Sequence, residues 1–426
     1  MIDSFLAAAR PGIAKLLAKA VLGKDLSETE VVELLSAKDS DLLAVLCAAN
    51  YSLQDTVGAV VTYVVNRNIN FTNVCVKHCG FCAFSRSYRS EEGYYLPIEA
   101  IVGRAKEAFR FGATEVCIQA GLPPDLQGDF YIHLCRAIKE ATPELSIHAF
   151  SPEEILYGSK QSGMTIKEYL QELKDAGLGS LPGTSAEILD DDVRSIISPG
   201  RISTSQWVEV ISTAHQLGIP TTSTMMYGHV ETEHHQARHL LLIRDLQRRT
   251  GGFTEFVPLS FVHTEAPMYK HQLVEGVRPG ATGTEVLKIH AVARLVLNHD
   301  IPNIQASWVK NGIQLAQACL MAGANDLGGT LINESISTAA GARFGQWMRP
   351  AELRRAIREA GRIPAERSTS YKVRQRFEAK EDDGNKAGAL DRLSDSEAER
   401  FGSFSQMIHS SEFRFREKSY SRPVPG

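Results

Sequence analysis

Three of the seven cysteines in this 426-residue chain lie within one short segment, FTNVCVKHCGFCAFSR at residues 71–86. Cys75, Cys79 and Cys82 have the spacing C-x3-C-x2-C. Thiolates are the usual ligands of iron–sulfur clusters and structural zinc, and both centres ordinarily take four protein ligands. A four-iron cluster held by only three cysteines keeps one iron free for a substrate or cofactor. The spacing therefore predicts a catalytic iron–sulfur site.

Other interpretations of this segment remain open. A zinc ion could take His78 as its fourth ligand, although His78 adjoins Cys79 and adjacent residues rarely both point at one tetrahedral ion. Three unligated structural cysteines are another possibility. At the level of function, the alternatives are a metal-stabilised barrel without catalytic activity and an electron-transfer protein. Iron and sulfide analysis of protein purified without oxygen distinguishes an iron–sulfur protein from a zinc protein.

The same segment resembles the signature of the radical S-adenosylmethionine enzymes, C-x3-C-x-aromatic-C. The resemblance implies that Cys75, Cys79 and Cys82 hold a 4Fe–4S cluster and that Phe81 lies against the adenine of S-adenosyl-L-methionine. It also implies that the reduced cluster donates one electron to the sulfonium and that the resulting 5'-deoxyadenosyl radical attacks a bound substrate.

Four further residues are candidates for cofactor binding. The resemblance places Gly121, in CIQAGLPPD, in a turn whose backbone meets the methionyl amine; a plain tight turn is the alternative. Ser185 and Glu187, in LPGTSAEIL, would face the sulfonium and ribose, unless Glu187 caps the following helix. Arg201, in SPGRIS, is predicted to pair with a carboxylate, or else lies on the surface.

Four polar residues follow predicted strands and are candidate catalytic groups: His148, His229, Glu231 and His263. In a parallel barrel, polar residues at the carboxyl ends of strands point into the mouth, where they can bind substrate or move protons. The alternative for each histidine is a hydrogen-bonded structural role.

An α/β architecture must position these residues. From Val60 to Leu331, short β-branched runs such as TEVCIQ and TEFVPLSFV alternate with helix-like stretches such as STSQWVEVISTAHQLG. This order predicts parallel strands with crossover helices, and about eight strands can be drawn if LGSLPG and NDLGGTL are counted. We therefore expect a TIM-type (β/α) barrel with the cysteine segment after its first strand. An open doubly wound sheet is the alternative, but the first strand is not followed by Gly-x-Gly-x-x-Gly.

The chain divides into three parts by composition. Residues 1–55 are predicted to form a helical segment, in which Ser27 and Glu30 make a capping box. Residues 56–377 are assigned to the barrel and its C-terminal extension. Residues 378–426 are polar and broken by turn residues, and we expect a disordered tail.

Composition excludes some classes of protein. The chain is 43% hydrophobic and 23% charged with a net charge of −4, so it lacks the basic field that nucleic-acid binding requires. No apolar run approaches the roughly 18 residues of a membrane span. The odd number of cysteines argues for a reducing compartment, which we take to be the cytoplasm.

A longer resemblance extends from about residue 50 to 377. Segments such as GLGSLPGTSAEIL, TTSTMMYGHVET and ASWVKNGIQLAQACLMAGANDLGGTLINESIS resemble the second subunit of FO synthase, a family of 4-hydroxyphenyl transferases in deazaflavin biosynthesis. The resemblance implies hydrogen abstraction from the amine of L-tyrosine, cleavage of its Cα–Cβ bond, and addition of the 4-hydroxybenzyl group to 5-amino-6-(D-ribitylamino)uracil.

That resemblance also implies partners. The product would pass to FO synthase subunit 1, a second radical enzyme, and an electron donor such as ferredoxin or flavodoxin would reduce the cluster. The alternative within the superfamily is a menaquinone-pathway enzyme of the aminofutalosine synthase or cyclic dehypoxanthinyl futalosine synthase type, which shares stretches such as MMYGHVET.

Overall fold

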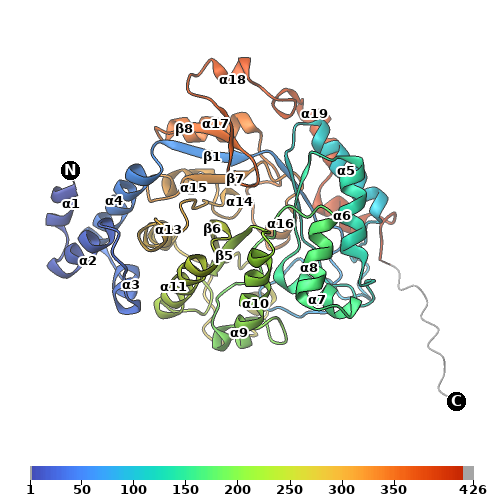
Figure 1. The fold of residues 1–426 in the computed structure, drawn as a ribbon, viewed down its shortest axis with the longest axis horizontal. Helices are drawn as coiled ribbons and strands as arrows, with labels where there is room; N and C mark the ends of the chain where they lie inside the picture. Colours follow the sequence, from blue (N-terminus) through green and yellow to red (C-terminus); the bar gives the residue numbers. More distant parts are fainter. Residues whose placement is uncertain (1, 416–426) are drawn as a thin grey trace.

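The computed structural model describes residues 2–415 (Figure 1). Its strands form three sheets, with the orders β7-β1-β8-β9, β2-β3-β4 and β5-β6. All neighbours are parallel except β8 and β9. The strands are β1 (Val60–Val64), β2 (Asn66–Ile69), β3 (Glu115–Ile118), β4 (Ser146–Ala149), β5 (Thr221–Tyr227), β6 (Phe253–Ser260), β7 (Asp326–Gly329), β8 (Ile363–Arg367) and β9 (Val373–Arg376).

Single parallel bridges join these sheets edge to edge. The bridges link His148 with Ser180, Leu181 with Thr221, Phe256 with Ile304, Gln305 with Asp326, and Arg67 with Ile332. The order of paired strands is therefore β2, β3, β4, residues 180–181, β5, β6, residues 304–305, β7 and β1. β1 and β2 follow each other along the chain, so this order returns to its starting point. Residues 180–181 and 304–305 occupy two further strand positions, each reduced to single bridges. Pro182 and Pro302 border these segments and lack the amide hydrogen that a longer ladder needs.

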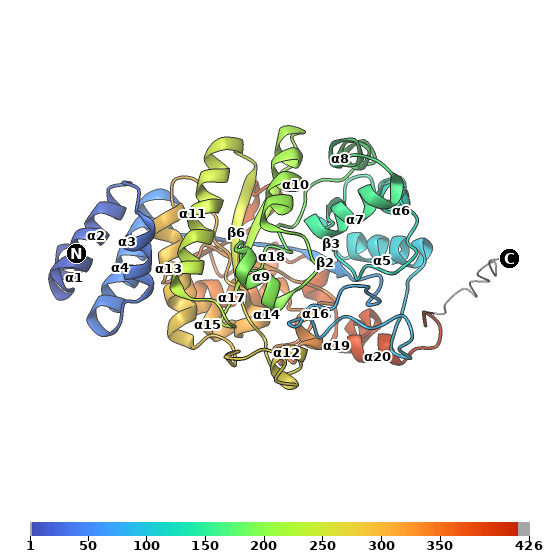
Figure 2. The ribbon, with the colours of Figure 1, turned by 90° about the horizontal axis from the view of Figure 1, so that it is seen from below.

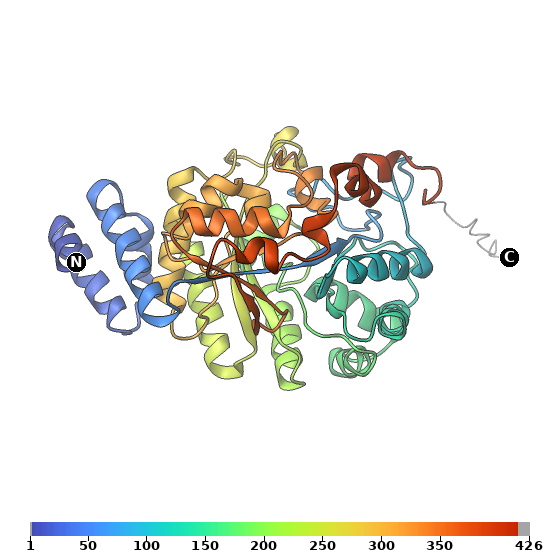
Figure 3. The same cartoon turned by 90° about the horizontal axis from the view of Figure 1, so that it is seen from above.

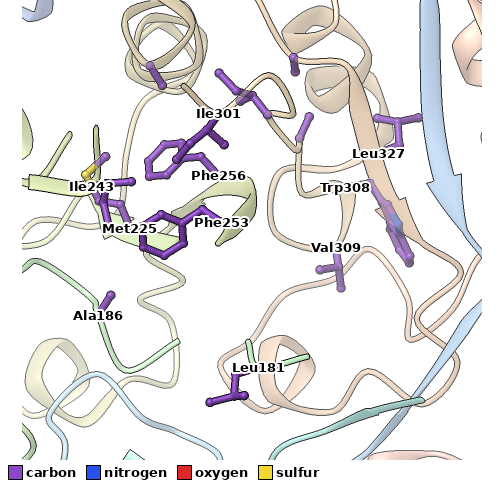
Figure 4. Packing of buried hydrophobic residues seen from close by; sticks show 14 of the residues in the cluster. Leu181, Ala186, Met225, Ile243, Phe253, Phe256, Ile301, Trp308, Val309 and Leu327 are labelled. Carbon is purple, nitrogen blue, oxygen red and sulfur yellow. The ribbon is translucent and has the colours of Figure 1, made fainter. Parts of the chain in front are cut away.

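Helices follow most of the strands and cover the outside. They are α5 (Ile98–Arg110), α6 (Phe130–Ala141), α7 (Pro152–Ser162), α8 (Ile166–Asp175), α9 (Asp191–Ile197), α10 (Thr204–Gln216), α11 (Glu233–Thr250), α12 (Pro267–Lys270), α13 (Gly283–Leu297), α14 (Trp308–Asn311), α15 (Ile313–Cys319), α16 (Ile336–Ala339) and α17 (Pro350–Glu359). Their apolar faces pack against strands that are themselves buried on both faces, as expected for parallel sheets. Figure 4 shows this packing, in which Phe253 and Phe256 of β6 lie beside Met225 of β5 and Ile243 of α11.

Four N-terminal helices lie at one end of the molecule (Figures 1 and 2). They are α1 (Ile2–Ala8), α2 (Pro11–Val21), α3 (Glu28–Leu35) and α4 (Asp39–Thr56). Helix α4 packs along α13, and α3 packs along α11. The capping box predicted from Ser27 and Glu30 is present at the start of α3. Among the described residues, no helix is both long and apolar enough to cross a membrane.

Strands β8 and β9 lie beside the amino-terminal end of the first strand. β8 pairs with β1, and Arg367 at its end donates to Asp326 of β7 over 2.6 Å. Tyr371, between β8 and β9, donates its hydroxyl to Glu255 of β6. These buried contacts join the C-terminal extension to the interior of the sheet ring.

The expectation of a disordered tail needs correction for residues 378–415. This segment forms α18 (Asp382–Asn385), η1 (Leu390–Arg392), α19 (Asp395–Ala398), η2 (Glu399–Phe401) and α20 (Phe404–His409). Leu390, Phe401 and Phe404 are buried, so a few widely spaced apolar side chains anchor an otherwise polar sequence. Figure 3 shows the dark red helices at the end of this segment beside the blue and cyan chain that follows β2. The remainder of the predicted tail, residues 416–426, lies outside the described residues.

Candidate active site

Cys75, Cys79 and Cys82 line one cavity of about 230 Å³ beyond the carboxyl ends of the strands. Backbone hydrogen bonds fasten their loop to neighbouring loops: the Val76 amide donates to Leu122, and the Gly80 amide donates to Ile197. The segment that connects β2 to α5 is therefore held in place by the loop that follows β3 and by the end of α9. The cysteines face the region where parallel barrels carry their active sites.

The thiols of this loop are largely shielded from water. Burial raises the pKa of Cys79 to about 12, although the Arg201 guanidinium acts in the opposite direction. Burial also raises the pKa of Cys75. Ligand thiols must lose their protons, so binding of iron here releases protons and depends on pH. Within residues 2–415 no three His, Cys, Asp or Glu groups converge closely enough to hold a single metal ion, whereas cysteines of a cubane cluster each bind a different iron atom.

Arg201 lies at the centre of the polar side of the cavity. Its guanidinium donates to Glu187 Oε1 over 3.1 Å, to Glu153 Oε2 over 3.3 Å and to Ser185 Oγ over 2.5 Å. The same group lies 5.8 Å from the centroid of the Phe81 ring. The structure thus brings together four of the five residues predicted to bind a cofactor, and it adds Glu153.

The backbone that carries Ser185 and Glu187 adopts an uncommon conformation. Their φ angles are 62° and 38°, in the left-handed region that non-glycine residues rarely occupy. Arg194, itself buried, donates hydrogen bonds to the carbonyls of Ser185, Ala186 and Ile188 and so holds this loop. Strain of this kind persists where surrounding contacts determine the conformation, and it is concentrated at functional sites.

One carboxylate oxygen of this site lacks a hydrogen bond. Oε2 of Glu187 is buried and accepts none from the described residues, although Arg194 Nη1 lies 3.5 Å away. A buried unpaired acceptor is costly unless a ligand supplies the missing donor. The residues present therefore fit a cluster with a cationic, hydroxyl-bearing cofactor: three thiols on one side, and an acceptor carboxylate with an aromatic face on the other.

Gly121 lines the cavity at a position where a larger residue would not fit. A Cβ atom at this position would lie 2.3 Å from the Val74 carbonyl oxygen, because the cysteine loop passes directly over it. Its amide donates to the Thr72 carbonyl. The glycine therefore permits close approach of the two loops, and its predicted contact with a methionyl amine stays a prediction.

The sequence profile of the radical SAM superfamily matches residues 69–243, and that of the CofH/MqnC C-terminal region matches residues 250–380. The chain is 49% identical to the 5-amino-6-(D-ribitylamino)uracil–L-tyrosine 4-hydroxyphenyl transferase of Methanothermobacter thermautotrophicus over 358 residues, which is 84% of this chain and 96% of that protein. It is 50% identical to the enzyme of that name from Methanocaldococcus jannaschii, over 82% of this chain and 97% of that protein.

The chain belongs to the radical SAM superfamily, in the family of these transferases. It is also 47% identical to the FO synthase of Mycobacterium leprae, where the match covers 82% of this chain but 40% of that longer protein. Among solved structures, methylornithine synthase has a TM-score of 0.64 at 20% identity, covering 82% of this chain and 97% of that one. The FeFe-hydrogenase maturase HydG has a TM-score of 0.65 at 17% identity, covering 85% and 79%. These two similarities concern the fold.

None of the four candidate catalytic residues lines the cysteine cavity of this radical SAM protein. His229 donates from Nε2 to the Met226 carbonyl and accepts the Val230 amide at Nδ1, so it is folded back onto its own turn. Glu231 accepts the amides of Gly228 and His229. The side chains of His229 and Glu231 thus make hydrogen bonds within the turn that follows β5. The prediction that they point into the mouth was wrong.

His263 also lies away from the cavity. Its ring packs edge-on against Tyr269, with centroids 4.6 Å apart, in the loop that follows β6. His148 is different, since it belongs to β4 and lines a second cavity inside the ring of strands. There its Nδ1 lies 2.6 Å from Ser180 Oγ, and burial lowers its pKa, so the ring is neutral.

Glu153 and Glu154 are site residues that we did not predict from the sequence. Glu153 accepts the Ile202 amide and lies 3.2 Å from Lys77, besides binding Arg201. Glu154 accepts the Ala120 amide and caps α7 through Ser151, and burial raises its pKa to about 7. The sequence SPEE at the start of α7 carries a capping-box pattern, which predicts the cap but not its second contact with the β3 loop.

Proposed function

We propose that this protein is a radical transferase that cleaves L-tyrosine at Cα–Cβ and adds the 4-hydroxybenzyl group to 5-amino-6-(D-ribitylamino)uracil. The observation that carries the proposal is an alignment at 49–50% identity over 96–97% of transferases of that name, together with three thiols on one cavity. The alternative is a menaquinone-pathway enzyme, because the matching C-terminal profile is shared between two kinds of protein.

In this proposal Cys75, Cys79 and Cys82 hold a 4Fe–4S cluster, and Phe81, Gly121, Ser185, Glu187 and Arg201 surround S-adenosyl-L-methionine. When bound, the cluster and this cofactor supply a radical that removes a hydrogen atom from the substrate. Arg201 holds the Glu187 carboxylate in position, which leaves its second oxygen for the cofactor. The walls of the cavity would keep the reacting atoms close together.

The remaining partners follow from the same proposal. We place the protein in the cytoplasm, which agrees with seven cysteines that form no disulfide. A ferredoxin or flavodoxin would supply the electron, and FO synthase subunit 1 would take the product.

The test is an anaerobic assay of protein with a reconstituted cluster. The protein is incubated with S-adenosyl-L-methionine, dithionite, L-tyrosine and the diaminouracil, and the products are measured by liquid chromatography and mass spectrometry. We expect 5'-deoxyadenosine and an adduct that carries the ring of isotopically labelled tyrosine. Subunit 1, added afterwards, should convert this adduct to FO. Activity on a futalosine-type substrate without any tyrosine adduct would contradict the proposal and favour the menaquinone-pathway alternative.

A further inference from the structure

A second cavity of about 240 Å³ fills the interior of the strand ring and adjoins the cysteine cavity. The two cavities have six lining residues in common, from six different segments of the chain: Gln119, Thr184, Thr224, Leu259, Lys310 and Ile336. Lys310 is the charged member of this set. It belongs to the short helix α14, which follows the strand position at residues 304–305.

Lys310 carries a charge without a partner in the described structure. Its ammonium forms no hydrogen bond or ion pair with residues 2–415, and burial lowers its pKa. Glu334 is the acidic group that acts on it, but this carboxylate accepts the Ser337 amide instead of pairing with the lysine. Lys310 is half-buried, and a partly desolvated cation that lacks a counter-charge favours an anionic ligand.

The other charged groups that line the second cavity already have partners. Arg367 binds Asp326, Glu255 accepts the Tyr371 hydroxyl, and Glu115 accepts the Asn66 amide. The remaining lining is rich in uncharged hydroxyls and amides: Asn68, Asn70, Ser180, Thr222, Thr224, Gln305 and Ser307. The side-chain oxygens of Asn68 and Asn70 are buried without a hydrogen-bond partner among the described residues. Such a surface suits a neutral ligand rich in hydroxyl and amide groups.

We infer that Lys310 binds the carboxylate of L-tyrosine at the border between the two cavities, and that the neutral ribitylaminouracil occupies the second cavity. This inference rests on the proposed function. Of the functional groups on the two substrates, the tyrosine carboxylate is the one that is anionic at neutral pH. A carboxylate held at the border keeps the attached amine beside the cofactor cavity and directs the phenol ring toward the second substrate, as a reaction between the two requires.

The first test compares wild type with Lys310→Met, which removes the charge and approximately keeps the volume. We expect KM for L-tyrosine to rise about ten- to a hundredfold, as for loss of one charge-assisted contact. Because ground state and transition state lose this contact equally, kcat should change by less than about threefold. KM for the diaminouracil should not change. Lys310→Arg should recover part of the tyrosine affinity, and Lys288→Met, a half-buried lysine outside both cavities, should behave as wild type.

The second test measures binding without turnover. Equilibrium dialysis compares L-tyrosine with tyramine, which lacks the carboxylate. Wild type should prefer tyrosine by about ten- to a hundredfold, and Lys310→Met should bind both compounds alike. A lysine that only stabilises the fold would not change this preference. The wild-type measurement tests the inference even if Lys310→Met fails to fold.

The outcomes separate the inference from the proposed function. Adduct formation by wild type, with no tyrosine preference or with an unchanged tyrosine KM in Lys310→Met, would overturn the role of Lys310 alone. Wild type that forms no adduct from tyrosine would overturn the proposed function, and the inference with it.

Discussion

At the residue scale, Arg201 determines the geometry of the polar wall. A buried guanidinium presents several donors in a fixed plane, and here it binds the Glu153 carboxylate of α7 together with the Ser185 hydroxyl and the Glu187 carboxylate of a later loop. From the sequence, Ser185 and Glu187 were predicted by electrostatics and resemblance, and Arg201 was predicted separately as a partner for a carboxylate. It did not identify Glu153, because nothing in a local motif indicates which acidic side chain a distant arginine will meet.

A residue-scale prediction concerns Cys79→Ala. The variant should fold, with a loss of at most about 1–2 kcal/mol in the free energy of unfolding, because the side chain is small and lies in a loop. It should bind less iron than wild type and form no 5'-deoxyadenosine. Iron and sulfide analysis and an anaerobic cleavage assay measure this. Cys47→Ala, in the remote helix α4, is the control. Full 5'-deoxyadenosine formation by Cys79→Ala would show that this thiol is not a ligand.

Glu187→Gln tests the unpaired carboxylate oxygen. The amide keeps the shape of the side chain but removes its negative charge, so S-adenosyl-L-methionine should bind about ten- to thirtyfold more weakly. Iron content should equal that of wild type. Titration calorimetry on the reconstituted protein gives the affinity, and Glu209→Gln on α10 provides a control outside the cavity. An unchanged affinity would assign Glu187 a purely structural role with Arg201.

At the scale of elements, the C-terminal segment supports the loop that carries the cysteines. Phe404 of α20 packs against Phe84 with ring centroids 5.7 Å apart. The Tyr95 amide donates to the Phe413 carbonyl, and the Phe415 amide donates to the Gly93 carbonyl. The stretch from residue 84 to 95 therefore contacts a segment that composition alone had suggested to be disordered.

The prediction at this scale is that Phe404→Ala loosens the cysteine loop. Loss of the aromatic contact should make local opening more frequent, so a chelator should remove iron several-fold faster from the reconstituted protein. Decay of the cluster absorbance near 400 nm reports the rate. Phe344→Ala, at a half-exposed phenylalanine elsewhere, is the matched control. Equal rates for Phe404→Ala and wild type would mean that the segment does not support the cluster.

Secondary structure was predictable to different extents. Alternation of β-branched runs and amphipathic helices is a local signal, and it correctly indicated parallel strands with crossover helices, while the capping box of Ser27 and Glu30 marked the start of α3. By contrast, the strand positions at residues 180–181 and 304–305 and the helices after residue 377 form through contacts with segments distant in sequence. The burial of Phe401, for example, is made by Arg67, Phe111 and Trp347, which no local pattern connects to it.

At the scale of the whole molecule, buried titratable groups link stability to pH. His239 bridges α11 to the site loop: it accepts the Leu189 amide at Nδ1 and donates to the Thr224 carbonyl from Nε2. Burial lowers its pKa from 6.5 to about 3. Its contribution to stability is therefore complete above pH 6.5 and is lost as pH falls toward 3, because the unfolded chain binds the proton more readily. Burial raises the pKa of Glu154 to about 7, so its contribution to stability is complete below pH 4.5 and is lost as pH rises to 7.

Because the contributions of His239 and Glu154 change with pH in opposite directions, the effect of His239 is measured by comparing a His239 variant with wild type. His239→Gln should change the slope of unfolding free energy against pH by about 1.4 kcal/mol per unit between pH 6 and 4, relative to wild type. Urea titrations at several pH values measure it. His133→Gln, at an exposed histidine, is the control. Parallel pH profiles for His239→Gln and wild type would show that His239 does not titrate differently on folding.

The left-handed backbone at Ser185 and Glu187 has a consequence for laboratory evolution. Relief of such a conformation by glycine gains about 1–2 kcal/mol per position, more than the roughly 0.5–1 kcal/mol that glycine costs in chain entropy. At Glu187 glycine would also break the buried ion pair with Arg201, at a cost of about 3–5 kcal/mol that exceeds the gain. A library selected only for heat resistance would therefore be expected to reject glycine at position 187, so that selection for durability alone retains the carboxylate of the polar wall.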